Sequence, residues 1–231
     1  MSEKILETLM QLFAIIARPQ SNDSDRRGVV ESFLKRVLNQ ELAREYLSKY
    51  DKEYEEARIK LEKRGTERRE GAIAIRITKL CKEINEQGQL NKAQRIVVVI
   101  QLLEFCKSGD QKVSQLELGF IYTLADGLNI SSEEYGFIEK FVLNSFDDIP
   151  STSNLLIING IKNFNSKDTK HVLREMLKGH IWVLFVPSVK MYYVRYKGAG
   201  ELSMNGQLLQ EDKVYPLGQG TSIKGYKIAP V

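Results

Sequence analysis

Residues 121–142 read IYTLADGLNISSEEYGFIEKFV, and this stretch decides how the N-terminal part of the chain is organised. Apolar residues at helical spacing lie on both sides of a short polar turn, so the stretch predicts a helix, a turn and a second helix. Placing Ile121 on Phe13 aligns it without a gap to residues 13–34, which read FAIIARPQSNDSDRRGVVESFL. The second occurrence of the same pattern predicts a second helical hairpin.

The two stretches agree in residues on which helix packing depends. The aligned pairs are Ala17 with Ala125, Ser24 with Ser132, Gly28 with Gly136, Val30 with Ile138, Glu31 with Glu139 and Phe33 with Phe141. An internal repeat of this kind predicts two similar helical hairpins packed about a pseudo-twofold axis. A match of modest identity over so short a stretch can also arise by chance.

Helical periodicity continues between the two repeats. Apolar residues recur at helical spacing over residues 73–84 and 93–103. Residues 51–70 are different, because fourteen of the twenty are charged, seven of each sign. Pairs such as Glu56 and Lys60 are four residues apart with the acid first, which favours a solvated helix. We expect an exposed helix or a connection between two halves of the helical module, with a partner-binding coiled coil as the alternative.

After Pro150 the pattern becomes that of β-strands. Apolar runs rich in β-branched and aromatic residues lie at residues 154–158, 181–186, 191–196, 214–217 and 222–228. Asn205-Gly206 lies between two short strand-like runs and predicts a tight hairpin. The sequence therefore predicts an α+β protein of two modules. These are an all-helical, pseudo-symmetric bundle over residues 1–148 and a small, antiparallel, β-sandwich-like domain over residues 152–231.

Composition favours a globular protein in a reducing compartment. Of the 231 residues, 42% are hydrophobic and 28% are charged, as in soluble proteins. No apolar run approaches the length of a membrane span, and the start lacks the pattern of a secretory signal. Two cysteines, Cys81 and Cys106, are too few for a disulfide framework. We therefore expect a cytoplasmic protein without a membrane span.

The formal net charge of +4 is divided unevenly, with +6 in residues 151–231 and −2 in the rest. A basic module could face phosphates or an anionic membrane surface, but no dense cluster of lysine and arginine is present, so a solvated β-domain is the other interpretation. We expect no nucleic-acid partner, because residues 51–70 are not of a single sign. Gly218 to Gly225 departs from the phosphate-loop pattern, so nucleotide binding is not expected either.

The residues that carry enzymatic chemistry are sparse. The chain has two histidines, His171 and His180, and no Cys-x-x-Cys pair, so a zinc site is not expected. No spacing indicates a nucleophile with its base. His180 is interpreted as a residue at the entry of a strand. We expect no enzymatic activity from this chain.

The turn of the second repeat carries carboxylates from which a metal site could be built. The candidate ligands are Asp126, Glu133 and Glu134, with Asn129 or backbone carbonyls assisting, for a hard divalent cation such as Ca²⁺ or Mg²⁺. The same stretch also has a purely structural interpretation. Gly127 permits a left-handed backbone, and Ser131 with Glu134 forms an S-x-x-E capping box. Glu133 favours the helix dipole in the first turn.

Residues 123–134, TLADGLNISSEE, resemble the signature of the TerB-like (tellurite-resistance-associated) helical domains. The shared features are an Ala-Asp-Gly turn, a hydrophobic residue, a small hydroxyl residue and an acidic residue that opens a helix. The resemblance covers about residues 1–145 and implies an all-helical fold with pseudo-symmetric halves that binds a divalent metal through acidic residues near the turns. The first repeat departs from it, because Arg18-Pro19 stands where Asp-Gly would be.

The C-terminal module resembles part of a forkhead-associated β-domain, through Gly200 to Leu209 and Val214 to Ile223. Such domains read phosphothreonine through Arg, Ser and Asn on loops. Here Gly218-Gln219 stands where Gly-Arg is usual, and the Ser-x-x-His element is absent. Ser222 and Lys224 are the candidate anion contacts.

The order of the two modules is similar to the N-terminal region of bacterial ABC-transporter ATP-binding proteins. That resemblance implies a non-catalytic regulatory or interaction module, whose partners are another protein or downstream domains of the same chain. Because residues 229–231 directly follow a strand pattern, we expect the native chain to continue past Val231. The alternative is a stand-alone, divalent-metal-binding stress-response protein of TerB type.

Overall fold

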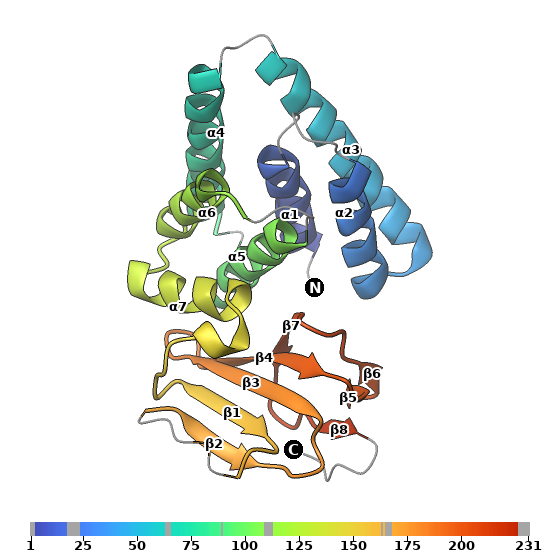
Figure 1. Cartoon of the computed structure of the whole chain (residues 1–231). Coiled ribbons are helices and arrows are strands. Elements are labelled where there is room, and N and C mark those ends of the chain that lie inside the picture. The colour runs from blue at the N-terminus through green and yellow to red at the C-terminus, as the bar shows by residue number, and fades with distance from the viewer. Residues whose placement is uncertain are drawn as a thin grey trace. The chain divides into compact units, whose positions relative to one another are not determined.

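A computed structural model describes residues 3–17, 24–62, 66–88, 90–108, 113–162, 164 and 168–225. The chain divides into two compact units, Met1–Glu139 and Lys140–Val231, each with its own internal contacts. Along the chain, the boundary between the units falls within helix α7, upstream of the boundary expected near residue 150. The α+β class is confirmed, because helices fill the N-terminal part of the chain and strands the C-terminal part (Figure 1).

Seven α-helices are described before the strands begin. They are α1 (Glu3–Ile16), α2 (Ser24–Val37), α3 (Gln40–Glu62), α4 (Thr66–Glu86), α5 (Lys92–Lys107), α6 (Gln115–Gly127) and α7 (Ser132–Leu143), followed by the short 3-10 helix η1 (Phe146–Asp148). In the first unit, α5 packs against both α1 and α6, α3 packs on α1, and α4 packs on α6. Helix α5 therefore lies in the middle of the helical core.

Both stretches of the proposed repeat form the expected helical pair, α1 with α2 and α6 with α7. Aligned positions have matching burial, since Val30 and Ile138 are both fully buried. The turn of the first repeat lies in residues 18–23, outside the described residues. The pseudo-twofold axis stays a prediction.

The charged segment 51–70 is helical wherever the structure describes it. It forms the end of α3 and the start of α4, with residues 63–65 between them outside the described part of the chain. Helix α3 carries a narrow buried stripe among its charges, formed by Ala43, Tyr46, Leu47, Tyr50 and Ala57. These residues follow helical spacing and pack α3 against α1.

In the described part of the second unit, eight strands form two sheets. They are β1 (Leu155–Asn159), β2 (Lys170–Leu173), β3 (Gly179–Val186), β4 (Met191–Gly198), β5 (Leu202–Met204), β6 (Gln207–Leu208), β7 (Val214–Leu217) and β8 (Ile223–Gly225). One sheet has the order β2-β1-β3-β4-β7 and the other β6-β5-β8. Residues of both sheets share one hydrophobic cluster, which includes Ile181, Val194, Leu202 and Ile223.

The predicted hairpin is confirmed at Asn205-Gly206. Both residues have positive φ, 51° and 85°, as the tight turn between β5 and β6 requires. The prediction of an antiparallel module was wrong for one pair, since β1 and β2 are parallel while the other pairs are antiparallel. Strand β2 escaped prediction because its four residues lack the alternation of a half-buried strand.

The end of α7 and η1 belong to the second unit because they pack on its larger sheet. Phe146 lies edge-to-face against Trp182 of β3, with ring centroids 5.3 Å apart. Arg195, which pairs with Trp182 across β3 and β4, donates hydrogen bonds to the carbonyls of Phe141 and Asn144 at 2.6 and 2.8 Å. One buried arginine therefore binds two of the carbonyls at the C-terminal end of α7.

Candidate functional site

The turn between α6 and α7 is a Schellman helix ending. The Ile130 N–H donates to the Ala125 carbonyl at 3.0 Å, and the Asn129 N–H donates to the Asp126 carbonyl at 2.9 Å. The sequence suggested Gly127 as the residue with a left-handed backbone. Asn129 has that conformation instead, with φ 60°. Much of the Ala-Asp-Gly signature therefore has a structural role in ending α6.

Gly127 is needed for a close approach of two helices. A β-carbon at this position would lie 2.8 Å from the Sγ atom of Cys81 in α4. The Gly127 carbonyl accepts a hydrogen bond from the Asn85 side chain at 2.9 Å, and the Leu128 carbonyl accepts one from Arg95 at 2.9 Å. Burial raises the pKa of the Cys81 thiol to about 11, so this cysteine stays protonated near neutral pH.

The three candidate metal ligands do not share one environment. Asp126 and Glu133 are exposed, whereas Glu134 is mostly buried and lies 3.6 Å from the Lys92 ammonium. The Glu134 N–H donates a hydrogen bond to the Ser131 hydroxyl at 3.2 Å, which is one of the two bonds of the predicted capping box. Among the described residues, no group of three or more His, Cys, Asp or Glu side chains converges on a point that could hold a metal. Metal binding at this turn stays a prediction.

Calorimetric titration with Ca²⁺ and Mg²⁺ tests that prediction. If Asp126 and Glu133 are ligands, the wild type binds one ion and an Asp126→Ala, Glu133→Ala variant loses the binding heat, because two carboxylates are removed from an exposed site. An exposed acidic pair elsewhere, Glu55→Ala with Glu56→Ala, is the matched control and should bind as the wild type does. Absence of heat at about 1 mM metal would contradict metal binding of any useful affinity.

The candidate anion contacts lie at the start of β8. The backbone of Ser222 is tied to the hairpin turn, since its N–H donates to the Asn205 side chain at 3.1 Å and its carbonyl accepts from the Asn205 N–H at 3.2 Å. Lys224 is exposed on β8. Anion binding by this pair stays a prediction.

Both histidines bind the same buried asparagine at the end of β1, an arrangement that sequence reasoning missed. The Asn159 side-chain oxygen accepts hydrogen bonds from the Ile161 N–H and from Nε2 of His171, both at 2.9 Å. Its amide nitrogen lies 3.3 Å from Nδ1 of His180 and donates to it. His180 is the second residue of β3, as expected. The three side chains tie β1, β2 and β3 together, which gives them a structural role.

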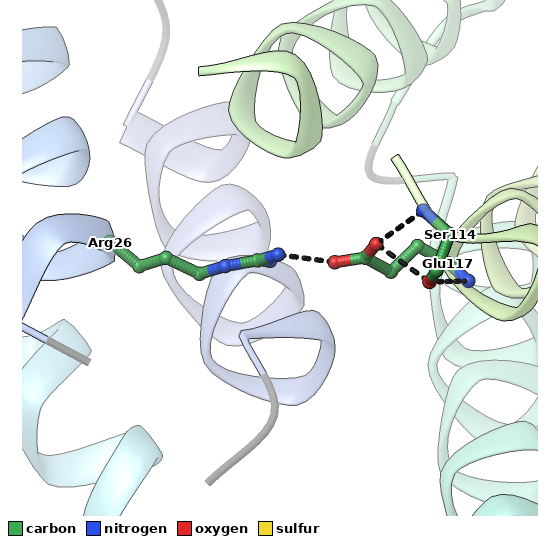
Figure 2. Close-up of polar contacts among 3 residues, drawn as sticks. All are labelled: Arg26, Ser114 and Glu117. Atoms are coloured by element: carbon green, nitrogen blue, oxygen red, sulfur yellow. Dashed lines mark hydrogen bonds and ion pairs between the residues drawn. The ribbon is translucent and has the colours of Figure 1, made fainter. Parts of the chain in front are cut away.

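A buried ion pair joins α2 to α6 in the helical unit. Figure 2 shows Arg26 extending from α2 to the Glu117 carboxylate, beside Ser114. Glu117 also accepts hydrogen bonds from the Ser114 N–H at 2.8 Å and hydroxyl at 2.7 Å, and Ser114 caps α6 in return. The guanidinium of Arg26 lies 5.3 Å from the centre of the Phe105 ring.

Two opposing effects set the pKa of Glu117. Burial raises it, but the hydrogen bonds from Ser114 and the contact with Arg26 outweigh burial and hold the pKa below the ordinary carboxyl value. Glu117 is therefore ionised near neutral pH. The Arg26–Glu117 ion pair links the two helices, so its role is to hold α2 on α6.

The first unit has an open groove between α3 and α4, with a volume of about 370 Å³. Its described lining residues are Ile15, Ala57, Lys60, Ala72, Ile73, Ile75, Arg76 and Lys79. Ile15, Ala57 and Ile73 are buried, whereas Lys60, Ile75 and Lys79 are exposed. The groove thus combines apolar walls with a cationic rim, and its described lining contains no carboxylate, histidine, cysteine or hydroxyl.

Sequence reasoning missed this groove, although one signal was present. Ala72, Ile75, Arg76 and Lys79 recur at helical spacing and form a second face of α4, beside the face of Ile73, Ile77 and Ile84 that packs inward. Ile75 on that second face has an exposed fraction of 59%, so it has no role in the core.

None of the described helices combines the length and the apolar composition needed to cross a bilayer. Comparison of the chain with protein-family models, with curated proteins and with solved structures gives no match.

Proposed function

We propose that this chain is a non-catalytic regulatory or interaction module, and that it acts at the cytoplasmic face of the membrane as the N-terminal part of an ABC-transporter ATP-binding protein. The observation that carries the interaction role is the groove between α3 and α4. Its described walls offer apolar contact and positive charge, and its described lining contains no carboxylate, histidine, cysteine or hydroxyl.

The polar clusters elsewhere support the same role. Arg26 pairs with Glu117, and Asn159 hydrogen-bonds to the two histidines. Groups of this kind hold helices and strands in place. Partner binding is therefore expected to involve surface residues. The link to a transporter comes from the order of the modules, a helical TerB-like unit before a small β-unit with an Asn-Gly hairpin.

Fractionation of source cells tests the transporter part of the proposal. An antibody raised against this chain should detect a band much larger than 26.5 kDa in the membrane fraction, because the module would be joined to downstream domains. A band near 26.5 kDa confined to the soluble fraction would overturn the transporter link.

A further inference from the structure

We infer that the groove between α3 and α4 binds an amphipathic helix of a partner protein, and that this helix carries carboxylates beside its apolar face. The inference rests on the proposed interaction role and names the chemistry of the partner. It is independent of whether the chain belongs to a transporter.

The dimensions of the groove fit two turns of a helix. The α4 residues that line it run from Ala72 to Lys79, a distance of about 10 Å along the helix axis. Ala57 and Ala72 are small, so a partner backbone can approach closely between α3 and α4. The buried side chains of Ile15 and Ile73 form the apolar floor against which large side chains of the partner would pack.

The shape of the groove favours a helix over a small molecule. Small-molecule pockets bury most of the surface of their ligand. Here Ile75 projects from the wall with an exposed fraction of 59%, so the apolar surface continues outward from the floor. A helix lying in the groove covers both the floor and Ile75, as in other complexes in which an amphipathic helix occupies a groove.

The charges on the rim select carboxylates. Two lysines and an arginine line the groove, namely Lys60, Arg76 and Lys79. Arg76 is held 2.8 Å from Glu53 of α3, which joins the two helices. Lys60 lies 3.4 Å from Glu56 at an exposed site, where such an ion pair is weak and its lysine can turn to a partner. Lys79 makes no ion pair with any of the described residues.

Direct binding to the full chain tests the inference. The probe is a fluorescein-labelled peptide made of two Leu-Glu-Ala-Leu-Glu-Glu-Ala heptads, which places leucines on one helix face and glutamates beside it. We expect saturable binding by fluorescence anisotropy. The Ile75→Asp variant and the Lys60→Glu, Lys79→Glu variant should each bind at least about tenfold more weakly, because they remove an apolar anchor and reverse the rim charge.

Two matched variants control for effects outside the groove. Ile59→Asp changes an exposed isoleucine of α3 that does not line the groove, and Lys82→Glu reverses an exposed charge on α4. Both should keep the wild-type affinity within about twofold. Since Ile75, Lys60 and Lys79 are all exposed, the groove variants should fold, which circular dichroism verifies.

Four results would overturn the inference. One is no saturable binding of the acidic peptide up to about 1 mM. Another is equal binding of a peptide in which lysine replaces every glutamate. A third is binding of decanoate, but not of the peptide, with the same dependence on the variants, which would assign the groove to a small amphiphile. The last is a concentration-dependent dimer abolished by Ile75→Asp, which would assign it to a second copy of this chain.

Discussion

The Arg195→Met variant should lower the free energy of unfolding of the second unit by about 3 kcal/mol, the largest effect that we expect from a single substitution. Arg195 is 2% exposed, yet its guanidinium has a partner in every direction. It donates to Asp212 at 2.7 Å and to the carbonyls of Phe141 and Asn144, and it lies 4.5 Å from the centre of the Phe146 ring.

The size of the effect follows from what the substitution leaves behind. Methionine fills a similar volume but cannot donate, so the Phe141 carbonyl is left buried without its partner. Asp212 is 37% exposed and regains water, which limits its share of the loss. The ring of Phe146 also loses the cation that lies over it.

Urea unfolding followed by tryptophan fluorescence measures this effect. Trp182 is the only tryptophan of the chain and pairs with Arg195 across β3 and β4, so its emission reports on the second unit. Lys197→Met on the same strand is the matched control, because Lys197 is exposed, and it should change the free energy by no more than about 0.5 kcal/mol. If the Arg195→Met variant unfolds at the same urea concentration as the Lys197→Met variant, Arg195 does not have the stabilising role assigned to it.

The Glu117→Gln variant should destabilise the first unit by about 2 kcal/mol at pH 7. Glutamine keeps the capping geometry with Ser114, since this position of a capping box accepts Glu or Gln. The substitution therefore removes the charge alone and leaves the Arg26 guanidinium opposite a neutral group. Because the Arg26 side chain is 16% exposed, partial hydration keeps the effect below that of a fully buried pair.

The effect of Glu117→Gln should also depend on pH. The folded protein holds the pKa of Glu117 below the ordinary carboxyl value of 4.5, so ionised Glu117 stabilises the fold above that pH. As the pH falls below about 4.5, wild-type Glu117 takes up a proton and its stabilisation is lost. The difference between wild type and variant should therefore shrink below pH 4.5, whereas it should stay constant between pH 6 and 8.

Urea unfolding followed by circular dichroism at 222 nm measures both parts of this prediction, because helices make up the first unit. Glu133→Gln on α7 is the matched control, since that carboxylate is exposed and should change stability little. A stability difference that stays constant down to pH 3 would contradict the assigned role of the Glu117 charge.

Helix α3 and strand β2 show where sequence reasoning failed. The buried stripe of α3 consists of small residues and tyrosines set among many charges, so the segment is typical of a solvated helix or a connection. Strand β2 has four residues of mixed polarity and pairs in parallel with β1. Unlike an antiparallel hairpin, a parallel pair has no tight turn between its strands, so no local turn pattern specifies it.

Local patterns by themselves determined the α+β class, the helices of both repeats, the Asn205-Gly206 turn and several strands. They act over three or four residues, through helical spacing, strand alternation and the φ angles of the turn. Tertiary structure alone decided which polar groups are buried and where apolar surface stays open. Arg195, Glu117 and Asn159 resemble surface residues in the sequence, and their burial depends on partners up to 91 residues away. The groove likewise exists only because α3 and α4 contribute its two walls and α1 contributes Ile15 to its floor. The sequence of any one of these helices does not show that the three come together.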